Sequence, residues 1–175
     1  TKLRSCKHPM PYSIADLNHM SQEEFVAALG AVFEDTPKIT QIVWNDRPFR
    51  NGTELHQKMV AVVQAMSEDE QLALICAHPD LGSKAKMAEA SVQEQSGVGL
   101  DRLSANEFER FHQLNQRYRD TFGFPFIIAV KNHTKASILE AFEQRLQHDR
   151  ATEQQQALTE ITHIARFRLE SLIQE

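Results

Sequence analysis

A histidine followed by a proline ends an apolar stretch in the sequence LICAHPDLGSKAK (residues 74–86). His78 has two interpretations at this position. It can be a helix C-cap that interacts with the last carbonyl groups and the helix dipole. Alternatively, Pro79 holds it on a rigid corner where it can transfer protons. Because the dipole favours the imidazolium, His78 in the second interpretation could serve as a proton donor near neutral pH.

A group of polar residues precedes a glycine-containing turn in SVQEQSGVGL (residues 91–100). Ser91 and Glu94 have the spacing of a capping box, in which the two side chains would simply close a helix N-terminus. The spacing alone favours that interpretation. The alternative is that Ser91, Glu94 and Gln95 offer a hydroxyl, a carboxylate and an amide to a polar small molecule.

Arg168 lies on the apolar face of a long amphipathic helix predicted over roughly residues 151–173. That face follows helical spacing and comprises Leu158, Ile161, Ala165, Leu169 and Leu172. A guanidinium on a buried face is costly unless it meets an anion. Arg168 therefore either reaches the surface on its aliphatic chain or binds a carboxylate in planar, bidentate geometry.

The elements that position these residues are predicted to be helices. Capping boxes of the form Ser-x-x-Glu begin at Ser21, Ser67 and Ser104, and each is followed by apolar residues at helical spacing. Thr36, which precedes a proline, and Thr134 are predicted as further N-caps. The pattern indicates a predominantly helical protein.

One stretch, FPFIIAV (residues 124–130), has the bulky and β-branched composition of a buried strand. No partner strand is evident, so its main-chain groups need helix ends, water or a ligand as hydrogen-bond partners. The sequence contains no repeat and no linker that would divide domains. We therefore predict one all-α domain over residues 1–175, a bundle of about eight helices with one buried extended segment at 124–130.

Composition excludes several classes of function. The net charge of −5 and the lack of a basic patch argue against a nucleic-acid partner. No apolar run approaches the roughly 20 residues of a membrane span. Neither a secretion signal nor a peroxisomal C-terminal tripeptide is present, so a cytoplasmic location is expected. Histidines and cysteines lack metal-ligand spacing, and no nucleotide-binding motif occurs, so we expect neither a metal nor an organic cofactor.

Four motifs follow one another along the chain: HPDLG (78–82), SVQEQ (91–95), FGFPFI (122–127) and RL (168–169). In this order they resemble the OHCU decarboxylases. Those enzymes convert 2-oxo-4-hydroxy-4-carboxy-5-ureidoimidazoline (OHCU) to (S)-allantoin in the last step of urate degradation. The likeness extends to the N-terminal half through MPYSIADLNHMSQEEFVAALGAVFEDTP (10–37) and RPF (47–49).

The resemblance implies a cofactor-free, stereoselective decarboxylation. It assigns His78 as the catalytic histidine, Glu94 as its acidic partner and Arg168 as the arginine that anchors the substrate. The substrate would be lined by Pro79, Ser91, Gln95 and the main chain of Phe126, Ile127 and Ile128. The resemblance is also compatible with a homodimer.

Two other functions are considered. A hydrolase acting on a related ureide would use His78 and Glu94 to activate water, and it would release urea or ammonia in place of carbon dioxide. A non-catalytic helical interaction module would use His78 and Ser91 as caps only. The second alternative predicts no thermal stabilisation by small ureides, whereas a true ligand stabilises the folded state by mass action.

Overall fold

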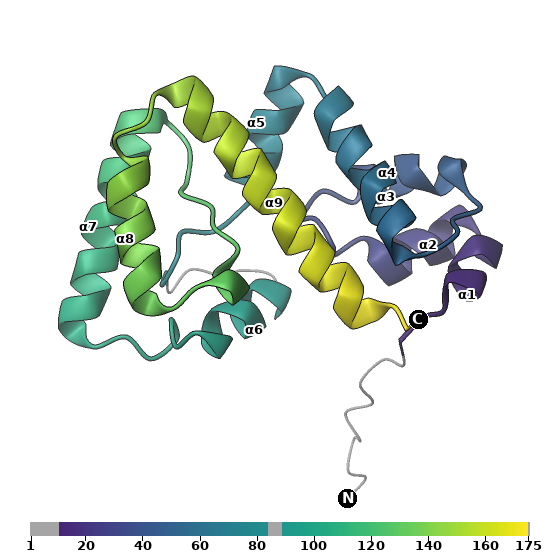
Figure 1. The fold of residues 1–175 in the computed structure, drawn as a ribbon, viewed down its shortest axis with the longest axis horizontal. Coiled ribbons are helices and arrows are strands. Elements are labelled where there is room, and N and C mark those ends of the chain that lie inside the picture. The colour runs from purple at the N-terminus through teal and green to yellow at the C-terminus, as the bar shows by residue number, and fades with distance from the viewer. Residues whose placement is uncertain (1–10, 84–88, 175) are drawn as a thin grey trace, which may run out of the picture.

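The computed structural model describes residues 11–83 and 89–174, and this part of the chain is all-α, as predicted (Figure 1). It contains nine α-helices where about eight were expected. The helices are α1 (Ile14–His19), α2 (Gln22–Leu29), α3 (Lys38–Val43), α4 (Gly52–Ala65), α5 (Glu68–Cys76), α6 (Glu89–Gly97), α7 (Ala105–Phe122), α8 (Lys135–Arg145) and α9 (Arg150–Leu172). Two short 3-10 helices, η1 (Trp44–Asp46) and η2 (Val130–Asn132), complete the described elements.

Local capping signals place most of these helices. Ser21, Ser67 and Ser104 each accept a hydrogen bond from the glutamate N–H three residues later, and each glutamate side chain accepts from the serine N–H in return. Thr134 caps α8 in the same way. The prediction for Thr36 is wrong. The first turn of α3 has no side-chain cap, and the Thr36 hydroxyl donates to the main-chain carbonyl of Glu34 at 2.8 Å instead.

Helix α9 crosses the middle of the molecule, with α6, α7 and α8 on one side and α1 to α4 on the other (Figure 1). Its buried face includes Leu158, Ile161, Ala165 and Leu169, as the spacing predicted. Arg168 stays on that face with 5 % exposure, so it does not extend to the surface. An arginine in this position requires anionic partners.

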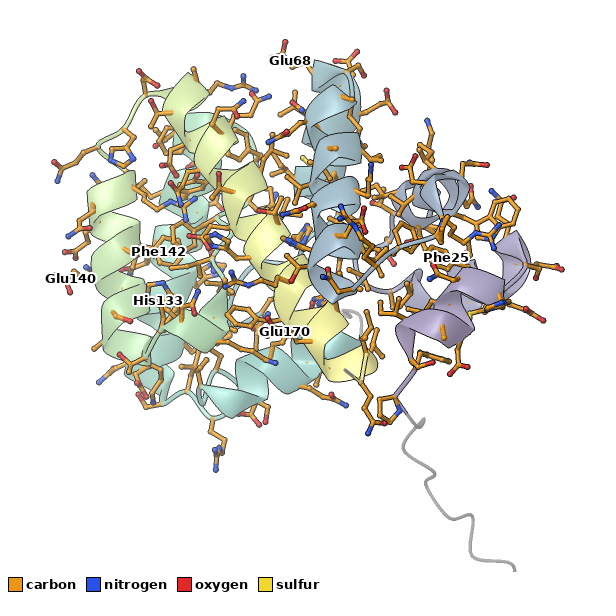
Figure 2. The ribbon with its side chains drawn as sticks, turned by 45° about the vertical axis from the view of Figure 1, so that its right-hand side comes forward. Phe25, Glu68, His133, Glu140, Phe142 and Glu170 are labelled. Carbon is orange, nitrogen blue, oxygen red and sulfur yellow. The ribbon has the colours of Figure 1, made fainter. Side chains whose placement is uncertain are left out.

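The extended segment is confirmed as buried and free of any strand ladder over residues 124–129, whereas Val130 begins the 3-10 helix η2. The segment begins after Gly123, which ends α7 in the left-handed conformation with φ 81°. Helix α8 packs against this segment. Phe142 points into the core, where its ring stacks on that of Phe126 with the ring centroids 3.7 Å apart. Glu140 of the same helix points outward (Figure 2). The segment is thus held by packing, which leaves its main-chain groups to find other partners.

Candidate active site

His78 follows the C-cap of α5 and is fixed by a main-chain hydrogen bond. Its ring nitrogen Nδ1 lies 3.0 Å from the carbonyl oxygen of Leu74, one turn earlier in the helix. A carbonyl oxygen only accepts, so Nδ1 carries the hydrogen, and in the neutral ring Nε2 holds the lone pair. Among the described residues, nothing forms a hydrogen bond with Nε2. The ring is therefore oriented with its proton-accepting nitrogen unoccupied.

Burial sets the protonation state of His78. Removal of the ring from water lowers its pKa below the ordinary 6.5. The hydrogen bond to Leu74 and the negative charges of Glu34 and Asp35 oppose this effect, while Arg168 adds to it. The net direction is downward, so His78 is neutral at neutral pH. The expectation of a protonated donor was wrong because the effect of burial on the pKa outweighs the hydrogen bond to Leu74 and the nearby carboxylates.

Arg168 is the centre of a buried cluster of charges. Its Nε and Nη2 atoms donate to the two carboxylate oxygens of Glu94 at 2.8 and 3.1 Å, which is bidentate geometry. Nη2 also donates to the hydroxyl of Ser91 at 3.0 Å, and Nη1 donates to Glu34 at 3.1 Å. The Ser91 hydroxyl donates in turn to Glu34 at 2.9 Å. Arg168 thus stays buried and pairs with two carboxylates of the protein itself, Glu34 and Glu94.

The capping-box interpretation of Ser91 and Glu94 is wrong. Ser91 lies inside α6, which begins at Glu89, and its side chain is directed to Glu34 and Arg168. Glu94 lies one turn further along the same helix. Their three-residue spacing places both on one helix face, from which they contact Arg168 of α9. Neither oxygen of Glu94 forms a hydrogen bond with His78 in the described part of the chain.

Gln95 joins the histidine corner to α6. Its Oε1 accepts a hydrogen bond from the main-chain N–H of Gly82 at 3.1 Å. Asn115 of α7 donates to the carbonyl of Leu81 at 2.9 Å, and Arg119 pairs with Asp80 at 2.9 Å. Three bonds from two helices thus hold the loop after His78, which explains how a short corner keeps the imidazole ring in place.

A small cavity of about 30 Å³ lies among these residues. It is lined by His78, Pro79, Leu81, Ser91, Glu94, Gln95, Ile127, Ile128, Val130, Ile164 and Arg168. All but one of the residues predicted for the site therefore meet at one place. Phe126, whose main chain was predicted to line the substrate, is the exception: it does not line this cavity, and its ring stacks on that of Phe142. A cavity of this size holds about two water molecules.

Ile127 and Ile128 of the extended segment line this cavity. Arg145 donates to the carbonyl of Ile127 at 2.6 Å, and Glu160 accepts from the N–H of Ala129 at 3.0 Å. The N–H groups of Ile127 and Ile128 form no hydrogen bond with any described residue. Buried donors without a partner are rare in proteins and indicate a place where another molecule binds.

Glu34 is the member of the cluster that sequence reasoning missed. It lies between α2 and α3 in AVFEDTP, where a charged residue is ordinarily exposed. Its side chain is nevertheless 1 % exposed. The burial depends on packing between segments far apart in the sequence, and no local spacing reports it.

Across residues 11–83 and 89–174, no three histidine, cysteine or carboxylate side chains are grouped so that they could hold a metal ion. None of the helices described there has the length and apolar content of a membrane span.

Comparison with known proteins gives the family. The family model described as OHCU decarboxylase matches residues 18–170. The 2-oxo-4-hydroxy-4-carboxy-5-ureidoimidazoline decarboxylase of Halalkalicoccus jeotgali is 44 % identical over 160 residues, which cover 91 % of each chain. The uric acid degradation bifunctional protein PucL of Bacillus subtilis is 45 % identical over 94 % of this chain, which spans only 33 % of that protein. A crystal structure of (S)-allantoin synthase superposes with a TM-score of 0.76 at 33 % identity, over 93 % of this chain and 54 % of the other. The chain belongs to the OHCU decarboxylase family.

Proposed function

We propose that this protein decarboxylates OHCU to (S)-allantoin, the last step of urate degradation. The observation that carries the proposal is the meeting of His78, Arg168, Ile127 and Ile128 around one cavity, where the N–H groups of the two isoleucines form no hydrogen bond with a described residue. His78 supplies a proton acceptor, Arg168 a cation, and the two N–H groups supply donors for carbonyl oxygens. The family to which the chain belongs supports the same reaction.

The chemistry needs no electron sink beyond the substrate. The carbon that loses its carboxylate carries a hydroxyl and adjoins a C=N bond. When the carbon–carboxylate bond breaks, its electron pair forms a C=C bond, and the imine nitrogen takes up the displaced pair together with a proton. The resulting enol loses its hydroxyl proton, and the neighbouring carbon gains a proton on one face to become the stereocentre of allantoin. Carbon dioxide leaves, and one proton is consumed overall for each carboxylate.

His78 is suited to the proton transfers. Since the buried ring is neutral, Nε2 can accept the hydroxyl proton directly. The imidazolium formed in this way is stabilised by the nearby carboxylate of Glu34. It can then return the proton to the carbon skeleton, and its fixed orientation decides which face receives it. The same residue thereby serves as base and then as acid.

Arg168 and Glu94 must exchange partners for this reaction to occur. The cavity holds only about two waters, and Glu94 occupies the Nε and Nη2 atoms of Arg168. The carboxylate of OHCU matches that of Glu94 in charge and shape. In our proposal it takes this edge of the guanidinium, and Glu94 turns toward His78 to assist it. Glu94 is the more exposed of the two carboxylates, with 13 % of its side chain accessible against 1 % for Glu34.

The test uses OHCU generated in situ from urate by the two preceding enzymes, with the circular dichroism of allantoin as the readout. The wild-type protein should produce an optically active (S)-allantoin signal. His78→Ala should reduce turnover by about 10²–10⁴-fold, the usual contribution of a positioned acid–base group. A matched control is His19→Ala, because His19 makes the same hydrogen bond to a carbonyl four residues earlier but is exposed.

The outcomes separate the candidate functions. Racemic allantoin formed at the uncatalysed rate would refute the decarboxylase. Release of urea or ammonia without carbon dioxide would indicate the ureide hydrolase instead. Loss of activity in both histidine variants would point to a folding defect and would remove the evidence for His78.

A further inference from the structure

Glu34 is buried between three segments of the chain. It projects from the connection between α2 and α3 and accepts hydrogen bonds from Ser91 of α6 and Arg168 of α9. A carboxylate with 1 % of its side chain exposed is unfavourable unless it is paired and fully hydrogen-bonded. Its neighbours are residues of the proposed site, so Glu34 belongs to that site physically, although it does not line the cavity.

The connection between α2 and α3 binds Arg168 through its main chain as well as through Glu34. Nη1 of Arg168 also donates to the main-chain carbonyls of Ala31 and Val32, at 3.3 and 3.5 Å. The chain turns back at Asp35, whose φ of 44° is a left-handed conformation that residues other than glycine seldom adopt. One edge of the guanidinium is thus held by a single short segment of main chain and side chain.

The two carboxylates on Arg168 hold different edges. Glu34 binds Nη1, whereas Glu94 binds Nε and Nη2. We propose that Glu34 is a positioning residue for the reaction: it holds Arg168 and Ser91 in place while the substrate replaces Glu94 on the other edge. This inference rests on the proposed function. In it, Glu34 is the fixed partner of Arg168 and Glu94 is the partner that the substrate replaces.

Electrostatics supports the same assignment. Among the charges that act on His78, that of Glu34 is the strongest, and it raises the pKa of the ring against the effect of burial. Removal of that charge should lower the pKa of His78 further. A residue that only stabilised the fold would leave the protonation of the catalytic histidine unchanged.

The test compares Glu34→Gln, Glu34→Asp and the wild type, with steady-state kinetics on OHCU at several pH values. Glu34→Gln should raise KM and lower kcat/KM by about 10–100-fold, because a displacement of a binding group by 1 Å costs rates of this size. The acidic limb of its kcat/KM profile should move to lower pH. Glu34→Asp keeps the charge, so it should keep the wild-type acidic limb while KM still rises. Glu140→Gln, an exposed carboxylate on α8, is the control and should match the wild type.

The results distinguish this inference from the proposed function. If the wild type forms no (S)-allantoin, the proposed function fails and the inference fails with it. If the wild type is active and Glu34→Gln keeps its KM and its acidic limb, the positioning role alone is refuted. If Glu34→Gln does not fold, Glu34→Asp decides: a raised KM at an unchanged melting temperature supports the role, and a normal KM overturns it.

Discussion

The guanidinium of Arg145 donates a 2.6 Å hydrogen bond to the main-chain carbonyl of Ile127, which places a buried charge next to a residue that lines the cavity. Nε of Arg145 pairs with Glu153 at 2.8 Å, and Glu153 has no exposed surface. The hydroxyl of Tyr118 and the ring of His148 also bind Glu153. Burial raises the pKa of Tyr118, so its hydroxyl stays protonated and can donate. The extended segment is therefore held from α8 and α9 by a buried network.

Glu153→Gln should destabilise the protein by about 3–5 kcal/mol, since it leaves the charge of Arg145 buried without its counter-ion. The measurement is the free energy of unfolding in urea. The matched control is Glu143→Gln, which breaks an exposed ion pair with Arg110 and should cost less than about 1 kcal/mol. Equal losses in the two variants would show that the buried network contributes no more than a surface pair.

Glu94→Gln should lower kcat and also lower KM. The neutral amide competes less well for Arg168, so the substrate carboxylate gains access to the Nε and Nη2 edge. The step assisted by the carboxylate is lost at the same time, which reduces kcat. Steady-state kinetics measures both constants. A raised KM would contradict the exchange of partners, because it would mean that Glu94 helps to bind the substrate.

The lowered pKa of His78 predicts how activity depends on pH. In the proposed mechanism the neutral ring is the reactive form, so kcat/KM should remain high as the pH falls through 6.5 and should decline only around the lower folded-state pKa. An acidic limb at or above 6.5 would contradict the buried, neutral histidine.

The same group links stability to pH. Above 6.5 the ring is neutral in both the folded and unfolded states, so it contributes no pH dependence. As the pH falls from there toward the folded-state pKa, the unfolded chain binds the proton first, and the folded state loses stability. His78→Gln should remove this part of the slope of unfolding free energy below pH 6.5. An unchanged slope would mean that the folded and unfolded pKa values are equal.

Features set by neighbouring residues could be predicted from the sequence, and features set by packing could not. The capping boxes at Ser21, Ser67 and Ser104 are local, so their spacing was sufficient. Ser91 and Glu94 have the same spacing inside α6, where it defines one face of the helix and no cap. The Ser-x-x-Glu spacing is the same in both cases, and only the position at which the helix begins distinguishes a capping box from a helix face.

The site shows the same division. His78, Pro79, Ser91, Glu94, Gln95 and Arg168 could be selected because they stand in recognisable motifs, and the cavity brings them together. Glu34 lies within the N-terminal stretch that resembles the family, but no spacing singles it out, and its burial depends on contact with α6 and α9. The protonation of His78 was also mispredicted, since the dipole of α5 is visible in the sequence but the extent of burial is not.

The turn at Gly123 gives a prediction that concerns the backbone alone. Its φ of 81° is left-handed, and a Cβ added there would meet no atom within 4 Å. Gly123→Ala should therefore cost only the conformational strain, about 1–2 kcal/mol in unfolding free energy. Gly97→Ala is the control. Gly97 also has open space around it, but its φ is not positive. It is the last residue of α6, where alanine favours the helical conformation. If both variants were equally stable, the left-handed turn would not be what requires glycine between α7 and the extended segment.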